Sequence, residues 1–87
     1  MGDTKKTIMF GADWCADCRR VKIMFDRLGV QYTYVDLVKD AAAIQVAQEI
    51  SGSTKIPVIV YSDHSFQVEP SNADIKTKVT ELNLGGA

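Results

Sequence analysis

The two cysteines of the 87-residue chain, Cys15 and Cys18, stand in a C-x-x-C arrangement within the stretch F-G-A-D-W-C-A-D-C-R-R. The apolar residues 7–10 just before it predict a strand, and a helix-period pattern begins at the motif. A strand that leads into C-x-x-C at the start of a helix is typical of a thiol–disulfide redox site. The unpaired N–H groups of a helix N-terminus favour a thiolate on Cys15, and the thiolate is the form that attacks disulfides. Cys18 lies one turn later on the same helix face, within reach of Cys15.

Two other interpretations of the cysteine pair stay open at this stage. The pair could be half of a zinc site, but zinc usually needs four ligands, and His64 and scattered carboxylates are the other candidates. The cysteines could also be inert core residues, since free cysteine is often buried. The position of the pair at a helix start favours the redox interpretation. His64 itself is expected in a surface turn and is given no role.

The composition bounds the class of protein. Eighty-seven residues with a hydrophobic fraction of 46% predict one small domain over residues 1–87, with residues 84–87 as a frayed tail. A net charge of −1 with dispersed Lys and Arg offers no electrostatic footprint for nucleic acid. The N-terminal apolar run is too short for a signal peptide or a membrane span, and a lone C-x-x-C suits a reducing compartment. We therefore expect a cytoplasmic monomer with no nucleic-acid or membrane partner.

Three helices are predicted from the spacing of apolar residues and from capping signals. The first buries one stripe and ends at Gly29; its stripe is Val21, Met24, Phe25 and Leu28. The second is capped by Asp40 and ends at Gly52; its stripe is Ala43, Val46, Ala47 and Ile50. The third is capped by Ser71 or Asn72, with Asp74 as the capping-box acid if Ser71 is the cap; its stripe is Ile75, Val79 and Leu82.

Four strands complete the predicted fold, over residues 7–10, 31–36, 58–61 and 66–68. The order is β-α-β-α-β-β-α. The β-α-β start predicts a parallel pair with a right-handed crossover, and the later β-β pair predicts an antiparallel hairpin. The expected fold is a four-stranded mixed sheet with helices on both faces. Cys15 would then lie beyond the carboxyl end of the first strand, where such sheets bind ligands.

The chain resembles a known family at three places. These are W-C-A-D-C after a strand at residues 14–18, K-I-P at residues 55–57, and E-P-S-N-A-D at residues 69–74. With these anchors the chain resembles a glutaredoxin-type member of the thioredoxin superfamily, most closely the actinobacterial mycoredoxins. The resemblance covers nearly the whole chain. It implies the thioredoxin-like fold predicted above from the spacing.

The resemblance implies a role for each sulfur. Cys15 is the exposed nucleophile and Cys18 is the resolving cysteine, and the two form a redox-active disulfide in the oxidised protein. In the reduced protein, Cys15 attacks a disulfide and becomes part of a mixed disulfide. A small thiol, or Cys18 from within the protein, then releases that intermediate.

Substrate-binding residues are also implied by the resemblance. Trp14 matches the tryptophan that borders the docking surface in the superfamily, although it could instead be a core residue. The bond between Ile56 and Pro57 is expected to be cis, which turns the Ile56 peptide groups toward the substrate. Lys55 is either a partner for an anionic thiol or a solvated charge.

The start of the last helix has two readings. Ser71 and Asn72 could hold a carboxylate of a thiol ligand at the helix N-terminus, or they could serve only as ordinary caps. Both roles are compatible with one another. For Pro70, just before them, we expect an ordinary trans bond.

The implied function is a thiol–disulfide oxidoreductase that reduces mixed disulfides or protein disulfides. Its co-substrate would be a low-molecular-weight thiol, mycothiol or glutathione, kept reduced by a thiol reductase system, with no tightly bound cofactor and no metal. K-I-P and E-P-S-N differ from the T-V-P and glycine-rich segments of glutathione-using glutaredoxins, which favours mycothiol or a protein dithiol. One alternative is a dithiol redoxin fed by a thioredoxin-reductase-like enzyme. Another is a metal or iron–sulfur binding module, although the chain lacks C-G-F-S.

Overall fold

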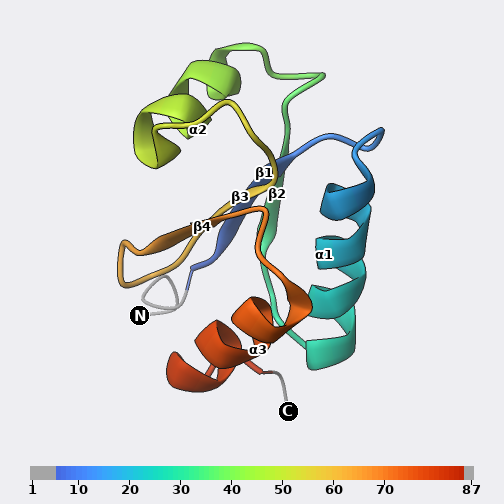
Figure 1. Cartoon of the computed structure of the whole chain (residues 1–87), viewed down its shortest axis with the longest axis vertical. Coiled ribbons are helices and arrows are strands. Elements are labelled where there is room, and N and C mark those ends of the chain that lie inside the picture. The colour runs from blue at the N-terminus through green and yellow to red at the C-terminus, as the bar shows by residue number, and fades with distance from the viewer. Residues whose placement is uncertain (1–5, 86–87) are drawn as a thin grey trace.

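A computed structural model describes residues 6–85 of the chain, and its elements follow the order β-α-β-α-β-β-α (Figure 1). The elements are β1 (Ile8–Gly11), α1 (Ala16–Leu28), β2 (Thr33–Asp36), α2 (Ala42–Ser51), β3 (Val58–Val60), β4 (Phe66–Val68) and α3 (Asn72–Glu81). This order is the one predicted from the sequence, and strand ends differ from the prediction by one or two residues. Element ends are the part that local patterns define least sharply.

The four strands form one mixed sheet in the order β2-β1-β3-β4. β1 runs parallel to β2, with Ile8 opposite Thr33, and antiparallel to β3, with Met9 opposite Ile59. β3 and β4 form an antiparallel hairpin. The predicted mixed sheet is thereby confirmed. Because β1 is an inner strand, the loop that follows it emerges in the middle of the sheet edge.

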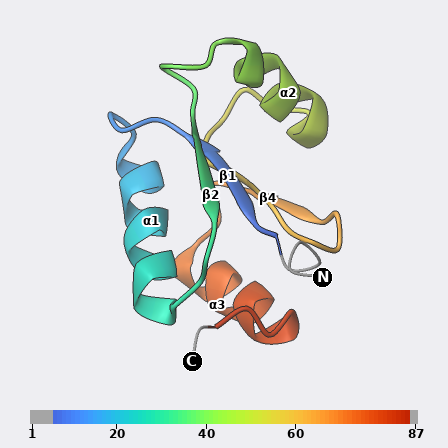
Figure 2. The ribbon, with the colours of Figure 1, turned by 180° about the vertical axis from the view of Figure 1, so that it is seen from behind.

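Helices cover both faces of the sheet, as predicted (Figure 2). α1 and α3 pack on one face and α2 packs on the other. The period-two alternation of the strands supplies both cores. Met9 and Ile59 point into the core under α1 and α3, and their neighbours Phe10 and Val58 point into the core under α2.

The first and last helices follow their sequence signals closely. The face of α1 that packs on the sheet is fully or largely buried; its residues are Cys18, Val21, Met24 and Phe25. Gly29 ends the helix in the left-handed region at φ 69°, where glycine carries no Cβ penalty. α3 begins with the predicted capping box, in which the Asp74 N–H donates to Ser71 Oγ and the Ser71 N–H donates to the Asp74 carboxylate.

α2 differs from its prediction at its start and on its surface. Asp40 does not cap it; the N-cap position is Ala41, whose backbone is already helical and which makes no side-chain capping bond. Of the predicted stripe only Ala43 and Ala47 are buried, whereas Val46 and Ile50 are exposed by 46% and 37%. The buried alanines form one i, i+4 ridge, and Val46 and Ile50 lie about 60° around the helix from it. Small alanines let the helix approach the sheet along that ridge alone.

The C-terminal end is ordered further than predicted. Leu84 is buried in the core under α1 and α3, and its N–H donates to Val79 O at 2.9 Å. The predicted frayed tail over residues 84–87 is therefore wrong at Leu84, because its side chain has a core to join. Residues 86–87 and the N-terminal residues 1–5 lie outside the described part of the chain. Within residues 6–85, no helix has both the length and the apolar character needed to cross a membrane.

Candidate active site

The two thiols lie at the first turn of α1 and have different surroundings. Cys15 occupies the N-cap position, and its Sγ accepts a hydrogen bond from the Cys18 N–H at 3.3 Å. A sulfur that accepts an unpaired helix N–H takes the place that a serine or aspartate oxygen usually fills. Cys15 is partly exposed and Cys18 is fully buried, and both are free thiols. The sulfur that a substrate can approach is therefore that of Cys15.

Cys18 is held in a tight space against the end of β1. A Cβ atom added at Gly11 would lie 3.0 Å from Cys18 Sγ and 3.3 Å from the Tyr34 ring. Burial raises the pKa of the Cys18 thiol to about 12, and its hydrogen bond with the Cys15 sulfur adds to the shift. Cys18 therefore keeps its proton at neutral pH. The sequence identified Cys18 but missed Gly11 and Tyr34, which become relevant only once the sulfur is placed.

The loop before β3 brings a distant segment to the reactive sulfur. The Ile56–Pro57 bond is cis, as the resemblance implies, and it is the one cis bond in the described residues. Cys15 Sγ lies 3.9 Å from the Ile56 carbonyl oxygen, although 41 residues separate the two in the chain. The structure thus joins two of the three anchors at one point.

The side chain of Arg20 ties α1 to the segment before α3. Its guanidinium donates to Pro70 O and to Asn72 Oδ1, each at 2.8 Å, and lies 3.4 Å from Asp17 Oδ1. Asn72 was predicted to bind a ligand, and in the structure its side-chain oxygen accepts a hydrogen bond from Arg20. These residues border a shallow polar hollow beside α1, which we call the polar hollow; its lining is Asp17, Arg20, Glu69, Ser71 and Asn72.

The loop between β1 and Cys15 is fixed by a second set of contacts, which the sequence analysis missed. Arg19 donates to the Asp13 carbonyl oxygen at 2.7 Å, and the Tyr34 hydroxyl donates to Asp13 Oδ1 at 3.1 Å. Lys22 Nζ lies 3.7 Å from the same carboxylate and 4.0 Å from the centre of the Tyr34 ring. Burial raises the pKa of Tyr34, and its bond to Asp13 adds to this, so the phenol stays a donor. No local spacing relates Tyr34 to Asp13.

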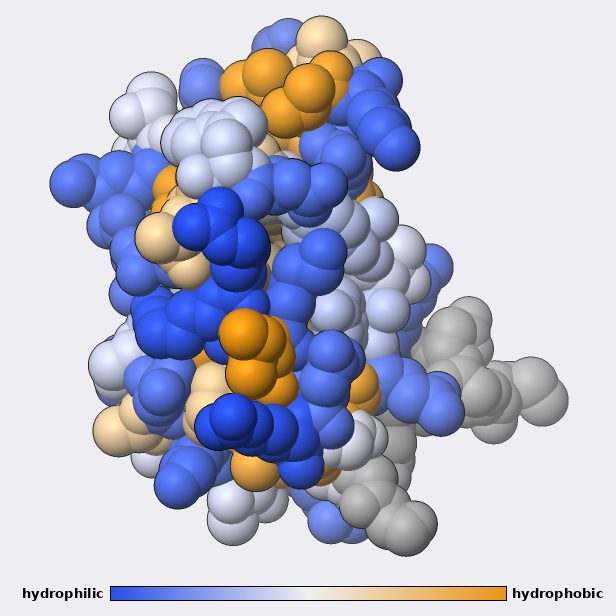
Figure 3. Space-filling view, turned by 90° about the vertical axis from the view of Figure 1, so that its right-hand side faces the viewer, coloured by the Kyte–Doolittle hydropathy of each residue, from blue (hydrophilic) through white to orange (hydrophobic). Residues whose placement is uncertain are grey.

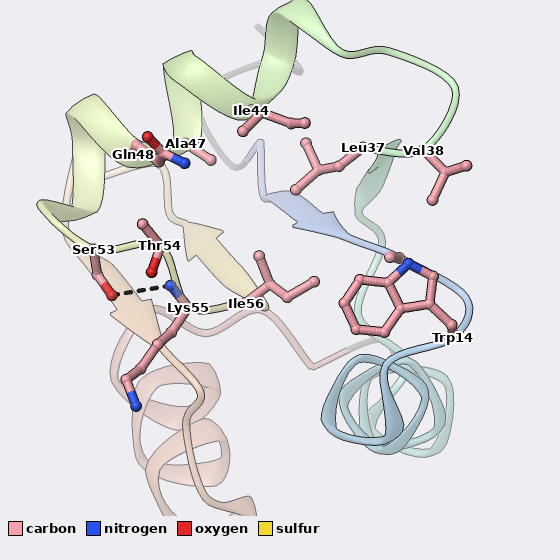
Figure 4. Close-up of a pocket in the computed structure, with 11 residues that line it drawn as sticks. Trp14, Leu37, Val38, Ile44, Ala47, Gln48, Ser53, Thr54, Lys55 and Ile56 are labelled. Atoms are coloured by element: carbon pink, nitrogen blue, oxygen red, sulfur yellow. Dashed lines mark hydrogen bonds between the residues drawn. The ribbon is translucent and has the colours of Figure 1, made fainter.

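An apolar groove of about 370 Å³ begins at Trp14, the residue that precedes Cys15. We call it the apolar groove; it is lined by Ala12, Trp14, Leu37, Val38, Ile44, Ala47, Gln48, Ser53, Thr54, Lys55 and Ile56 (Figure 4). Trp14 is 72% exposed, which places it at the surface rather than in the core. Its indole stands at one end of the groove, with Ser53 and Lys55 at the other. Lys55 makes no salt bridge to any described residue.

His64 lies in the turn between β3 and β4, exposed and in the left-handed region at φ 70°. It hydrogen-bonds through its backbone N–H to Tyr61 O at 2.9 Å, which closes the turn. Among residues 6–85, no three His, Cys, Asp or Glu side chains gather in a way that could hold a metal ion.

Comparison with known proteins assigns the family. The family model described as Glutaredoxin matches residues 7–66. The chain belongs to the glutaredoxin family. The matched segment runs from the start of β1 to the start of β4, so it includes Cys15, Cys18 and the Ile56–Pro57 bond. The family and the fold support a thiol redox function for this site, and glutaredoxins use glutathione or an analogous thiol as co-substrate.

Individual relatives agree with the family. A Mycobacterium tuberculosis protein described as a glutaredoxin is 24% identical over 80 residues, which are 91% of this chain and 95% of the relative. Mycoredoxin 1 of Corynebacterium glutamicum is 27% identical over 75 residues, which are 85% of this chain and 92% of the relative. The crystal structure of a glutaredoxin from Archaeoglobus fulgidus superposes with a TM-score of 0.75 at 26% identity, covering 93% of this chain and 88% of that one.

Proposed function

We propose that this protein is a thiol–disulfide oxidoreductase in which Cys15 is the nucleophile and Cys18 the resolving cysteine. The observation that carries the proposal is the difference between the two thiols. Cys15 is accessible and accepts a helix N–H, whereas Cys18 is fully buried and its pKa is raised to about 12. The accessible sulfur is the one that reacts with an external disulfide, and the buried sulfur reacts with Cys15 alone.

In the first step, the Cys15 thiolate attacks one sulfur of a substrate disulfide. A new S–S bond forms between Cys15 and that sulfur, and the other half of the substrate leaves as a thiolate. Cys18 can then attack Cys15 Sγ, passing its proton to the departing thiolate and leaving the Cys15–Cys18 disulfide. Alternatively, where the sulfur bonded to Cys15 comes from a small thiol, a second molecule of that thiol attacks that sulfur, which releases the Cys15 thiolate and leaves the disulfide of the small thiol. Either route transfers two electrons to the substrate.

We assign mycothiol as the co-substrate. The similarity to Mycoredoxin 1 supports this choice, as do the K-I-P and E-P-S-N segments, which differ from those of glutathione-using glutaredoxins. Trp14, Ile56 and Pro57 are proposed to contact the substrate beside Cys15. Lys55, Ser71 and Asn72 are proposed to contact its polar groups. Lys55 lines the apolar groove, and Ser71 and Asn72 line the polar hollow. We place the activity in the cytoplasm, because a lone C-x-x-C suits a reducing compartment, and we propose that the protein acts as a monomer.

The test also includes a second route, reduction through a Cys15–Cys18 disulfide, because Cys18 lies beside Cys15. The protein would then be a dithiol redoxin that a thioredoxin-reductase-like enzyme reduces directly. The two routes differ in their need for Cys18. A monothiol exchange with a small thiol needs Cys15 only, whereas reduction by such an enzyme needs both sulfurs.

The test is turnover of a small mixed disulfide with mycothiol, glutathione or a thioredoxin reductase as separate electron sources. Cys15→Ser should lower the rate at least about a hundredfold, since it removes the attacking thiolate. Cys18→Ser is the matched control and should retain turnover with mycothiol. Activity that depends on the reductase and is lost in both variants would replace the mycothiol route by the dithiol route. Full activity in Cys15→Ser would overturn the proposal.

A further inference from the structure

We propose that Glu69 determines which small thiols and disulfides react at Cys15. Glu69 lines the polar hollow, and its charge disfavours a reactant that places a carboxylate there. The same charge favours a reactant that places hydroxyl or amino groups there. The inference rests on the proposed function, because it concerns a reactant joined to Cys15 by a disulfide. It adds a specificity-determining residue and the class of reactant that this residue selects.

The backbone of Glu69 is tied to the loop that contacts the reactive sulfur. Its N–H donates to Pro57 O at 3.0 Å, and the neighbouring Ile56 carbonyl oxygen lies 3.9 Å from Cys15 Sγ. Glu69 also lies in the left-handed region at φ 48°, which a residue with a Cβ atom adopts at a cost. A group bonded to Cys15 on this side of the site therefore comes within reach of the Glu69 charge.

The one cation that lines the polar hollow is already engaged by the protein. Arg20 donates to Pro70 O and to Asn72 Oδ1, each at 2.8 Å, and it pairs with Asp17 at 3.4 Å. The hollow thus has one guanidinium for two carboxylates, and the second carboxylate is that of Glu69. Glu69 makes no salt bridge with any described residue. Its charge therefore acts on whatever occupies the hollow.

The N-terminus of α3 does not offset this charge. A helix start ordinarily attracts an anion, but here the capping box brings the protein's own anion to it. The Asp74 carboxylate accepts the Ser71 N–H at 3.2 Å, and the Asp74 N–H donates to Ser71 Oγ at 3.0 Å. A carboxylate on the reactant would therefore be repelled by Asp74 at the helix start as well as by Glu69.

These observations define the class of reactant. Figure 3 shows the side of the molecule that carries α1, and hydrophilic residues cover most of it, so an occupant of this side is polar. Hydroxyl and amino groups can donate to a carboxylate, whereas a second carboxylate cannot. Mycothiol carries hydroxyl groups and no carboxylate, and glutathione carries two carboxylates. Glu69 thus gives a physical reason for the choice between the two thiols.

The test measures oxidation of the pre-reduced protein by three small disulfides that differ in charge. Dithiodipropionate is anionic, 2-hydroxyethyl disulfide is neutral and cystamine is cationic. Cys15 attacks one sulfur of the disulfide, Cys18 then closes the Cys15–Cys18 disulfide, and two small thiols are released. The loss of free protein thiols gives the rate. Each rate with a charged disulfide is divided by the rate with the neutral one, and these ratios are compared between variants.

Glu69→Gln and Glu49→Gln make a matched pair. Both remove one negative charge from an exposed residue, but Glu49 belongs to α2, on the opposite face of the sheet from α1. Glu69→Gln should raise the anionic-to-neutral ratio about fivefold and lower the cationic-to-neutral ratio about threefold. Glu49→Gln should change neither ratio by more than about 1.5-fold, because the charge it removes is far from the hollow. In about 0.5 M salt the effect of Glu69→Gln should shrink below about twofold, since the Debye length is then about 4 Å.

A gain for the anionic disulfide in Glu69→Gln alone would support the inference. Equal shifts in the two variants would assign the effect to the net charge of the protein and overturn the role of Glu69. Unchanged ratios in Glu69→Gln would also overturn it, and normal oxidation by the neutral disulfide would then leave the redox function intact. If none of the three disulfides oxidises the wild-type protein, the proposed function fails and the inference fails with it.

Discussion

The helices on the two faces of the sheet differ in how much of their apolar stripe is buried. Under α1, the residues Val21 and Phe25 are completely buried, together with Cys18. Under α2, only Ala43 and Ala47 are buried, and the longer Val46 and Ile50 remain exposed. Both helices show an apolar stripe in the sequence. The stripe of α1 supports the fold, whereas much of the apolar surface of α2 is left for other contacts.

The comparison shows that one small domain has a closed side, with a fully buried helix stripe, and a more open side. The α1 side holds the Cys18 sulfur in a closed space, where we propose that it reacts with Cys15 alone. The α2 side needs only a narrow ridge of contact with the sheet, so Ile44 beside that ridge is free to line the apolar groove. The predictions below test whether this division of roles is real.

The pH dependence of stability should come from the α1 side. The Cys18 pKa is raised from 9.0 to about 12, so above pH 9 the unfolded chain loses a proton that the folded, reduced protein keeps. This contribution is present below pH 9 and is lost as the pH rises toward 12. We expect the unfolding free energy of Cys18→Ala to fall less steeply over this window, by about 1.4 kcal/mol per pH unit. Urea denaturation in reductant measures it, and parallel slopes would contradict the buried thiol.

Identical valine-to-alanine changes on the two helices give the most direct comparison. Val21→Ala should lower the unfolding free energy by about 2–3 kcal/mol, because it removes two fully buried methyl groups. Val46→Ala should change it by less than about 0.5 kcal/mol, since the side chain is exposed and alanine favours the helix. Urea denaturation of both variants measures the difference. Equal losses would mean that α2 also has a buried stripe.

Two glycine-to-alanine changes test how closed the α1 side is. Gly11→Ala puts a Cβ atom 3.0 Å from Cys18 Sγ, so we expect a loss of about 1–3 kcal/mol from overpacking. Gly85→Ala is the control, because its nearest neighbour would be Leu28 O at an ordinary 3.5 Å, and it should change stability by less than about 0.5 kcal/mol. Thermal unfolding compares them. A neutral Gly11→Ala would show that the sulfur has room to move.

The helix starts give the smallest effects. Ser71→Ala removes half of the capping box of α3 and should cost about 1 kcal/mol. Ala41→Ser at the start of α2 should give no gain, because the Ala41 backbone is already helical and a serine there cannot reach a free N–H. Urea denaturation measures both. A clear stabilisation by Ala41→Ser would show that α2 can accept a cap after all.

Much of the fold followed from local patterns in the sequence. Element order, the glycine helix stops at Gly29 and Gly52, and the Ser71 capping box all depend on neighbours within a few residues. The site was predicted where a motif marks it, at Cys15 and Cys18, and through the resemblance at the cis bond before Pro57.

The parts that could not be predicted depend on contacts between distant segments. Arg20 binds Asn72 across 52 residues, and Tyr34 binds Asp13 across 21, with no period or motif to relate them. The prediction that Ile50 belongs to the buried stripe of α2 failed for a related reason. A stripe shows that a helix has an apolar side, but it does not show how much sheet lies beneath it to cover that side.

The strand order has a consequence for self-association. The outer strands of the sheet are β2 and β4, with four and three residues. The two most apolar strands, β1 (I-M-F-G) and β3 (V-I-V), are the inner ones. An outer strand this short presents few unpaired backbone groups to another molecule. At high concentration, the protein therefore offers little template for the edge-to-edge pairing that begins amyloid-like aggregation.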